Sequence, residues 1–334
     1  MINRRTIVVG AAAFPFITRA RAAEPLIRAR QFHNQPTDSH QHQFLVDLWQ
    51  AVKQETDGKV EVTVFPQNDK VAGGDPAVLD MLVKGELEFF TLNGSLIARN
   101  VPVMDIQSFP FAYTTSEQVH ASNDGALGAY LSKECAAKGI HRFQFGLLEN
   151  GFKQISTVAK PITTADDLVG QRIRVPAGKI FEDMYVSLGA QPVVINFNKM
   201  VAAFKAGEID GQENPLAITE VNKLYEVTKY IAITNHSWAG FNLIANLAFW
   251  QKLPSDIQAV IDRNVKRYVA LQRKAAQQLN ASLEPKLKER GMIFTVADTA
   301  SFRKKLSVSF YPRWKEQLGK TAWELLEKEV GKLD

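Results

Sequence analysis

The sequence is poor in cysteine and has none of the long apolar runs that cross membranes. Cys135 is the single cysteine in 334 residues, which excludes an intrachain disulfide and a multi-cysteine metal site. We interpret it as a buried side chain in or near a helix and not as a reactive thiol, because free cysteine is usually buried. After the first twenty residues no uncharged apolar run reaches 18 residues, so no transmembrane span is expected.

Motifs of common enzymes and cofactor sites are missing as well. There is no Walker-type glycine-rich loop, no G-x-G-x-x-G after a strand, no H-E-x-x-H and no G-x-S-x-G. His40 and His42 could begin a metal site, but two histidines at a polar helix start are more often solvated. Asp166 and Asp167 could perform acid–base chemistry, but their place at a helix start favours capping. We therefore expect no cofactor, no bound metal and no catalytic residue.

The excess of positive charge is confined to the beginning of the chain. The formal net charge is +5, from 40 Lys and Arg against 35 Asp and Glu. Four arginines and no acid lie in residues 1–23, so subtracting those four leaves 36 basic residues against 35 acidic ones. A nearly neutral body without a Lys/Arg run argues against nucleic acid as a partner.

Residues 1–23 have the pattern of a cleavable export signal. A basic start is followed by an apolar run over residues 7–17 and then by small residues, with cleavage expected after Ala22 or Ala23. The Arg4-Arg5 pair resembles a twin-arginine signal, although many export signals carry two arginines by chance. We therefore predict a periplasmic protein whose folded part begins after residue 23.

The rest of the chain predicts two successive α/β units. Expected strands at 26–31, 60–64 and 87–92 alternate with helices at 44–52 and 77–83, which implies parallel pairing; Asp75 and Pro76 are typical of a helix cap and first turn. The pattern then restarts with a strand at 143–148, followed by an expected crossing near residues 149–151. Further strands are expected at 172–175, 192–195 and 230–234, and helices at 180–188 and 198–206. A capped short helix is expected at Thr164 to Leu168.

A long amphipathic segment follows at residues 254–291. Its apolar residues trace one helical stripe, and Pro285 is expected to kink or break it. The unbroken part of about thirty residues would be roughly 45 Å long at 1.5 Å per residue. It predicts either a strut across both units or two helices with a similar pattern.

Two stretches contain candidate binding residues. Arg174 lies inside a strand that otherwise reads as buried, within residues 171–181, and buried arginine is rare unless it is paired with an anion. Physical arguments alone favour an internal salt bridge for it over a ligand carboxylate. Asn214, within residues 206–215, could offer a donor and an acceptor to a ligand, or simply form a turn before Pro215.

Taken together, several ordered motifs resemble the extracytoplasmic solute receptors of tripartite ATP-independent periplasmic (TRAP) transporters, the DctP-like family. The resemblance covers nearly the whole mature chain. Its motifs are Asp210-Gly-Gln-Glu-Asn-Pro215 after the Val201–Gly207 helix, Asp167 to Pro176, Lys223 to Tyr230, Phe65-Pro66 through Gly73-Gly74-Asp75, and Phe109-Pro-Phe-Ala112.

The resemblance implies a two-lobe α/β periplasmic-binding-protein architecture with crossover strands and a long lobe-spanning helix. Lobe I would comprise 24–150 and about 240–279, and lobe II 151–239 and about 280–334. Such receptors are not enzymes: they enclose a small organic acid and deliver it to sodium-driven membrane permease subunits. We expect a monomer.

The resemblance also assigns ligand-binding residues. The family's carboxylate-binding Arg falls on Arg174 and the motif Asn on Asn214, while Lys153 stands where many members have a second Arg. A lysine is a point charge and not a fork, which puts bidentate binding of a second carboxylate in doubt. Weaker candidates at loop ends are Asn34, Asn93, Phe181, Asn235, His236, Trp238 and Phe241; the last two could stack on a ligand or fill core.

Two other functions share some of these features. A sensor that presents the same ligand to a membrane kinase would have the same fold. An exported enzyme could use Asp210 or Glu213 with a histidine, although no nucleophile–base spacing or metal set supports it.

Overall fold

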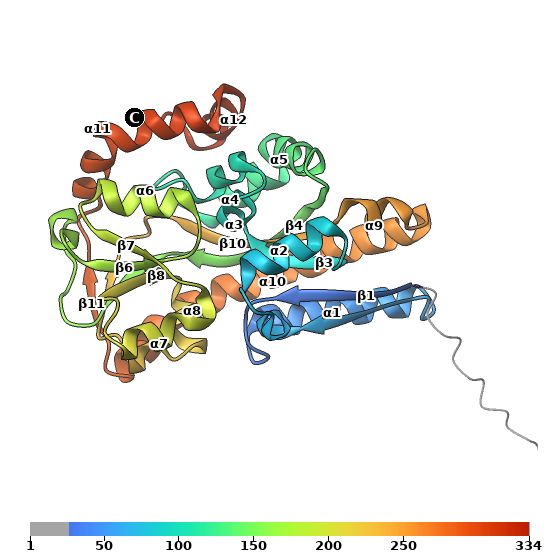
Figure 1. Cartoon of the computed structure of the whole chain (residues 1–334), viewed down its shortest axis with the longest axis horizontal. Helices are drawn as coiled ribbons and strands as arrows, with labels where there is room; N and C mark the ends of the chain where they lie inside the picture. The colour runs from blue at the N-terminus through green and yellow to red at the C-terminus, as the bar shows by residue number, and fades with distance from the viewer. Residues whose placement is uncertain (1–26, 334) are drawn as a thin grey trace, which may run out of the picture.

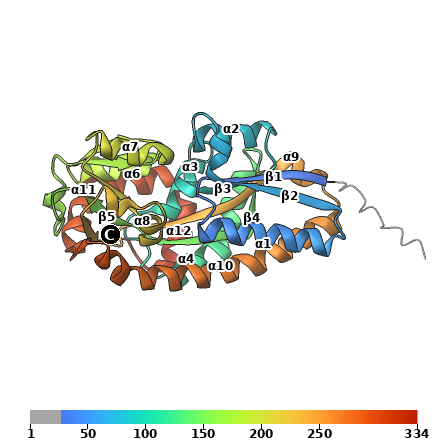
Figure 2. The same cartoon turned by 90° about the horizontal axis from the view of Figure 1, so that it is seen from below.

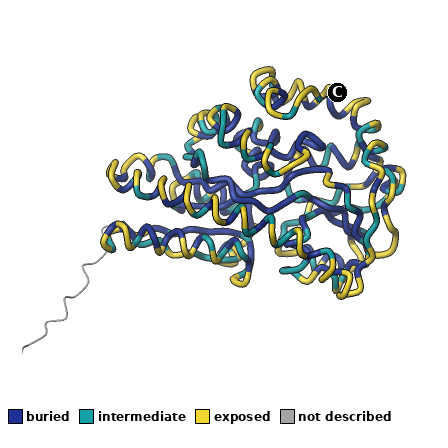
Figure 3. Tube along the Cα trace, turned by 180° about the vertical axis from the view of Figure 1, so that it is seen from behind, coloured by how far each residue is buried: buried dark blue, intermediate teal, exposed yellow. Residues whose placement is uncertain are grey.

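The protein consists of two α/β lobes joined by strands and by one long helix (Figure 1). The computed structural model describes residues 27–333, so the predicted export signal and its cleavage site lie outside the described residues. The strands of the sheets are mostly buried, whereas the helices expose their outer faces, as the colours along the tube in Figure 3 show.

Lobe I is built on a five-stranded sheet in the order β2-β1-β3-β10-β4. β1 pairs in parallel with β2 and β3, and β10 is antiparallel to β3 and β4. The predicted parallel pairing of the first strands is therefore confirmed. The strands are β1 (Ile27–His33), β2 (Val60–Phe65), β3 (Phe89–Asn93), β4 (Ile140–Phe152) and β10 (Trp238–Asn246). The helical elements are α1 (His40–Glu55), η1 (Pro66–Lys70), α2 (Asp75–Lys84), α3 (Gly94–Ile97), η2 (Pro102–Ser108), α4 (Ser116–Asp124), α5 (Ala126–Ala136) and α9 (Leu247–Lys252).

Lobe II is built on a six-stranded sheet in the order β11-β9-β5-β8-β6-β7. β6 is parallel to both β7 and β8, so its carboxyl end lies beside theirs at one sheet edge. The strands are β5 (Gln154–Thr157), β6 (Arg172–Val175), β7 (Gln191–Val194), β8 (Gly211–Asn214), β9 (Tyr230–Ile233) and β11 (Ile293–Val296). The helical elements are η3 (Ala165–Leu168), α6 (Lys179–Ser187), η4 (Phe197–Lys199), α7 (Met200–Lys205), α8 (Leu216–Val221) and η5 (Leu224–Glu226). The predicted cap is present, with Thr164 and Asp167 forming a capping box.

The connection between the lobes passes through β4 and β10. β4 continues through the predicted crossing at residues 149–151, and only Lys153 separates its end from the start of β5. Gly151 has a φ of +111° there, and a Cβ on it would lie 3.0 Å from the amide of Asn280. A side chain at this position would therefore meet both a strained backbone and a helix packed against the crossover.

Helix α10 (Ser255–Glu289) is the strut that spans both lobes (Figure 2). It is one helix of 35 residues, so Pro285 does not break it and the single-strut interpretation is correct. Leu283 and Leu287 are buried on either side of Pro285 in a lobe II cluster. Their packing offsets the one backbone hydrogen bond that proline removes near the helix end.

The C-terminal helices α11 (Thr299–Leu318) and α12 (Lys320–Val330) cover one side of the molecule (Figure 1). α11 packs against α6, whereas α12 packs against α4 and α5. Phe109 anchors this layer, since its ring lies 5.1 Å from Tyr311 and 5.0 Å from Trp323. α12 thus contacts elements that precede residue 150, and the division of the chain into lobes stays a prediction.

Several smaller expectations can be compared with this fold. Cys135 is buried as predicted, and burial raises the pKa of its thiol to about 12. The histidine pair is half-buried: His42 Nδ1 lies 2.9 Å from His33 Nε2, and His40 Nδ1 lies 3.2 Å from Gln272 Nε2. Within residues 27–333 no helix has the length and apolar character needed to cross a membrane.

Candidate ligand-binding cleft

Two adjoining hollows lie where the carboxyl ends of lobe II strands face lobe I loops. Their volumes are about 50 Å³ and about 160 Å³, and they share Asn34, Asp75 and Phe197. Ligands of open α/β sheets bind beyond the carboxyl ends of strands, which is the position of this cleft. The smaller hollow is also lined by Gln35, Asn93, Leu96, Asn150, Lys153, Arg174, Pro176, Glu213, Asn214, Ile218, Ala239 and Phe241. The larger one is also lined by Gln67, Asn68, Val71, Gly74, Asn196, Asn198, Val201 and Asn222.

Arg174 projects from β6 into the smaller hollow with only 2% of its surface exposed. Its Nε donates to the carbonyl of Ile195 at 2.8 Å, and its guanidinium carbon lies 5.9 Å from the Phe197 ring centre. Burial lowers the pKa of Arg174 to about 10, although Glu213 and Asp75 oppose this shift. Within residues 27–333 no carboxylate forms an ion pair with it, so the internal salt bridge favoured by physical arguments alone does not form.

Asp75 stands on the lobe I side of the same cleft, as the first residue of α2. Asn68 Nδ2 donates to its Oδ1 at 2.7 Å, and Asn34 Nδ2 donates to its Oδ2 at 3.0 Å. Burial raises the pKa of the Asp75 carboxyl, and the two amides and Arg174 oppose that rise. A carboxylate and a guanidinium thus face the cleft from opposite lobes.

Lys153 belongs to a buried ionic network in the wall of the smaller hollow. Its Nζ is hydrogen-bonded to Glu213 Oε1 and lies 3.4 Å from the Phe181 ring centre. Glu213 Oε2 lies 2.8 Å from His236 Nε2, whose Nδ1 contacts Thr234 Oγ1 at 2.7 Å. Burial raises the pKa of Glu213, but Lys153 and His236 outweigh it and hold that pKa below the usual value. The charge of Lys153 is therefore already balanced within the protein.

Four of the other predicted residues line the cleft, and the three asparagines among them are hydrogen-bonded within the protein. Asn93 caps α3 by accepting from Ser95 N at 3.0 Å and donates to Gly240 O at 3.0 Å. Asn214 Nδ2 donates to Gln212 Oε1. Asn34 and Phe241 complete the set.

Four predicted residues lie away from these two hollows. Phe181 and His236 are buried behind Lys153 and Glu213. Asn235 lines a different hollow of about 300 Å³ beside α10 and accepts from Gln154 Nε2 at 2.6 Å. Trp238 is 2% exposed, so of its two predicted roles the structure favours core packing.

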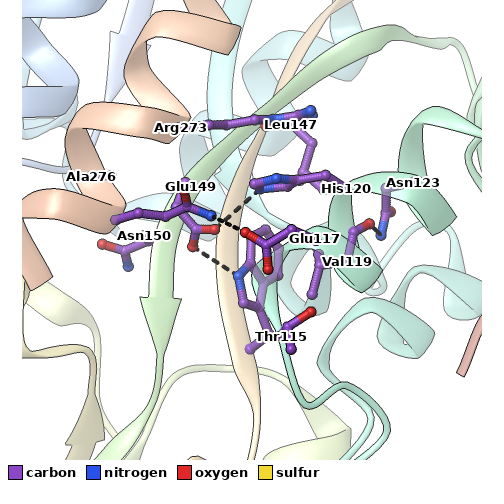
Figure 4. Close-up of polar contacts among 12 residues, drawn as sticks. Thr115, Glu117, Val119, His120, Asn123, Leu147, Glu149, Asn150, Arg273 and Ala276 are labelled. Atoms are coloured by element: carbon purple, nitrogen blue, oxygen red, sulfur yellow. Dashed lines mark hydrogen bonds and ion pairs between the residues drawn. The ribbon is translucent and has the colours of Figure 1, made fainter. Parts of the chain in front are cut away.

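Trp238 takes part in a polar cluster at the crossover. Its indole Nε1 donates to Glu149 Oε1 at 2.8 Å, and Glu149 Oε2 lies 3.1 Å from His120 Nε2. Figure 4 shows Glu149 on β4 facing His120 of α4. Gln272 of α10 fixes the backbone of the same residue by accepting from Glu149 N at 2.8 Å and donating to its carbonyl at 2.7 Å. Both crossover strands are thereby tied to each other and to lobe I.

The two lobes also touch directly at the mouth of the cleft. Asn196 Nδ2 of lobe II donates to the carbonyl of Gly73 in lobe I at 3.1 Å. At a second inter-lobe contact, a Cβ on Gly178 would lie 2.9 Å from the side chain of Ser95. These contacts depend on how far the lobes are closed.

Asp75, Gln35, Asn150 and Phe197 line the cleft but were not predicted as binding residues. Asp75 and Pro76 carried only the signal of a helix start. Phe197 directly precedes a predicted helix, and nothing local to it indicated a ligand.

Comparisons with known proteins agree with this geometry. Residues 32–317 match the family model of bacterial extracellular solute-binding protein, family 7 (DctP). The C4-dicarboxylate-binding periplasmic protein DctP of Rhodobacter capsulatus is 29% identical over 270 residues, covering 79% of this chain and 78% of its own.

Solved structures show the same fold. The sugar acid binding protein DctPAm of Advenella mimigardefordensis, in complex with galactonate, is 26% identical with a TM-score of 0.86, covering 93% of this chain and 99% of its own. A TRAP periplasmic solute binding protein of Sulfurospirillum deleyianum with bound succinate is 24% identical with a TM-score of 0.84, covering 93% of this chain and 100% of its own.

The family match spans most of the chain, and it confirms both the resemblance and the predicted two-lobe fold. The comparisons give no support to the sensor or the exported enzyme. The chain belongs to bacterial extracellular solute-binding protein family 7, the DctP family of TRAP transporter receptors.

Proposed function

We propose that this receptor binds a small organic acid through its carboxylate, with Arg174 as the binding cation, and delivers it to TRAP permease subunits. Relatives that bind a C4-dicarboxylate and galactonate support the ligand class. The chain would be exported by residues 1–23, cleaved after Ala22 or Ala23, and act in the periplasm as a monomer.

The observation that carries this proposal is the buried guanidinium of Arg174 without an anionic partner. Burying an unpaired charge is costly, so a cation kept in this state needs an anion at some stage of its function. A ligand carboxylate can accept two parallel hydrogen bonds from the guanidinium fork, which sets its orientation as well as its charge. Asn214, at the end of the adjacent strand β8, would orient the same group.

Lobe closure would provide the transport signal. Arg174 and Asn214 lie on lobe II, whereas Asp75 and Asn34 lie on lobe I. A ligand that contacts both walls binds the closed form better than the open form and therefore shifts the population towards it. The contact of Asn196 with Gly73 would then persist longer in the loaded receptor.

The candidate catalytic acids are engaged elsewhere, which supports a receptor over an enzyme. Asp210 accepts from Arg172 Nη2 at 2.6 Å and from its Nε at 3.0 Å. Glu213 is bound between Lys153 and His236. Neither carboxylate stands free beside a nucleophile.

Thermal shift against a library of organic acids tests the proposal, using wild type, Arg174→Ala and Arg172→Ala. Arg172 is the matched control, because it lies two residues away in β6 but pairs with Asp210 at 40% side-chain exposure. A ligand at 100 times its Kd should stabilise wild type and Arg172→Ala by about 2.7 kcal/mol and leave Arg174→Ala unchanged. The proposal fails if no carboxylate raises the melting temperature, or if Arg174→Ala responds like wild type.

A further inference from the structure

The cleft has a surplus of hydrogen-bond acceptors. Gln35 Oε1, Asn68 Oδ1 and Asn150 Oδ1 are buried, and no residue within 27–333 donates to them. All three side chains line the two hollows around Arg174 and Asp75. A buried acceptor left without a donor costs about 1–3 kcal/mol, so these oxygens call for donors from outside the protein.

Asp75 determines that the free atoms of Asn68 and Gln35 are oxygens and not amide nitrogens. An ionised carboxylate only accepts, so Asn68 and Asn34 must turn their Nδ2 groups towards it. Asn34 Oδ1 then accepts from Gln35 Nε2 at 2.7 Å, which leaves Gln35 Oε1 as the free end. Asn68 Oδ1 is free for the same reason. One carboxylate thus orients a chain of amides with acceptors at both ends.

Among the described residues that line the cleft, one cationic side chain has no carboxylate partner. Arg174 has no carboxylate partner, whereas the charge of Lys153 is balanced by Glu213. A second ligand carboxylate would have no cation of its own. It would meet Asp75 and the unsatisfied acceptors instead, and like charges in a desolvated site repel strongly.

We propose, on the basis of the function proposed above, that the ligand is a polyhydroxylated monocarboxylate of the sugar-acid class. Its carboxylate pairs with Arg174, and its hydroxyl groups donate to Gln35, Asn68 and Asn150. Hydroxyls both donate and accept, so several along one carbon chain can reach acceptors on three separate segments of lobe I. Phe197 and Phe241 supply apolar surface for the C–H groups of the same chain.

A factorial set of acids separates the two features of the ligand. Hexanoate, adipate, galactonate and galactarate differ only in hydroxyls and in a second carboxylate, and butyrate, succinate, erythronate and tartrate form the four-carbon series. Calorimetric titration of the full mature receptor should show one hydroxylated monocarboxylate binding about tenfold or more tighter than every other acid of its series, the order of one or two well-made hydrogen bonds. 6-Aminohexanoate tests whether an ammonium donor serves instead.

The variant Asp75→Asn tests the role assigned to the amide chain. It should weaken binding of the hydroxylated monocarboxylate about tenfold and change the affinity for hexanoate or butyrate less than twofold, because only hydroxyl groups donate to the oriented acceptors. Asp69→Asn is the control, since Asp69 is an exposed carboxylate in the neighbouring η1, and it should leave both affinities unchanged. An equal loss for both ligands with Asp75→Asn would assign Asp75 a structural role and overturn the inference.

The outcomes also separate this inference from the proposed function. If a dicarboxylate, an unsubstituted acid or 6-aminohexanoate binds as tightly as the best hydroxylated monocarboxylate, the ligand class is wrong while the carboxylate receptor stands. The same holds if none of these acids binds but another carboxylate does. If no carboxylate binds at all, both fail.

Discussion

Replacing Glu213 by Gln removes the anion that balances Lys153 in the buried network. Lys153 is 4% exposed and Glu213 1% exposed, so the lysine cannot recover its hydration without local opening. Breaking a buried ion pair by removing one partner typically destabilises a protein by about 3–5 kcal/mol. This destabilisation has an upper limit, because Lys153 can lose its proton instead of remaining as an unpaired buried charge. At pH 7, neutralising a lysine with an unfolded pKa near 10.4 costs about 4.6 kcal/mol.

This upper limit makes the effect of Glu213→Gln depend on pH. At pH 9 the same neutralisation costs only about 1.9 kcal/mol. Burial already lowers the pKa of Lys153, and without Glu213 it falls further. The stability of the variant relative to wild type therefore increases from pH 7 to pH 9 and decreases further as the pH is lowered below 7.

Urea denaturation of wild type, Glu213→Gln, Lys153→Met and the double variant measures this coupling. The double variant should recover much of the stability lost by Glu213→Gln, because replacing both members of a buried pair is often nearly neutral. A loss below about 1 kcal/mol at pH 7, a loss independent of pH, or a double variant no more stable than Glu213→Gln would refute the assignment of Lys153 as a charge balanced within the protein.

Three further predictions concern other parts of the structure. Burial and His42 lower the pKa of His33 to about 3 from 6.5. As the pH falls, the unfolded chain therefore takes up this proton before the folded protein does, and His33 should account for about 2 kcal/mol of the stability lost between pH 7 and pH 5. Chemical denaturation at both pH values should show a loss smaller by that amount in His33→Gln. Asn196→Ala removes the inter-lobe hydrogen bond and should weaken the ligand about two- to tenfold, mainly through faster dissociation in stopped-flow fluorescence; an unchanged dissociation rate would contradict this. Gly178→Val places carbon atoms where Ser95 lies, so it should hold the lobes apart and abolish ligand-induced closure in small-angle scattering while the melting temperature without ligand stays near that of wild type; normal closure would show that the approach is not tight.

The alternation of strands and helices was predictable because its signals are local. Val60, Val62 and Val64 mark a half-buried strand, and Thr164 with Asp167 marks a capped turn. Pro285 was expected to kink or break α10. It does not break the helix, because tertiary packing on either side of it, which no local pattern reveals, outweighs one lost hydrogen bond.

The candidate site was predictable only in part. The burial of Arg174 follows from its strand, but whether an internal acid pairs with it depends on the tertiary arrangement. Asp210 pairs instead with Arg172, two residues earlier in the same strand. Glu213 likewise meets Lys153 and His236 only when three separate segments come together. Pairing of this kind cannot be read from spacing along the chain.

Acceptor surplus in the cleft was also invisible at the sequence level. An asparagine in a loop is usually a turn residue. Whether its amide oxygen or its amide nitrogen stays without a hydrogen bond depends on the partner that the other atom contacts. Only the contact of Asn68 with Asp75 shows that its oxygen is left over.

The most direct test of the central claim is a crystal structure of the closed receptor with the tightest-binding acid from the titrations. We predict one ligand carboxylate with both oxygens within about 3 Å of the Arg174 guanidinium, and hydroxyl groups directed at Gln35, Asn68 or Asn150. A ligand whose carboxylate lies away from Arg174, or one bound outside the cleft between the lobes, would contradict the account.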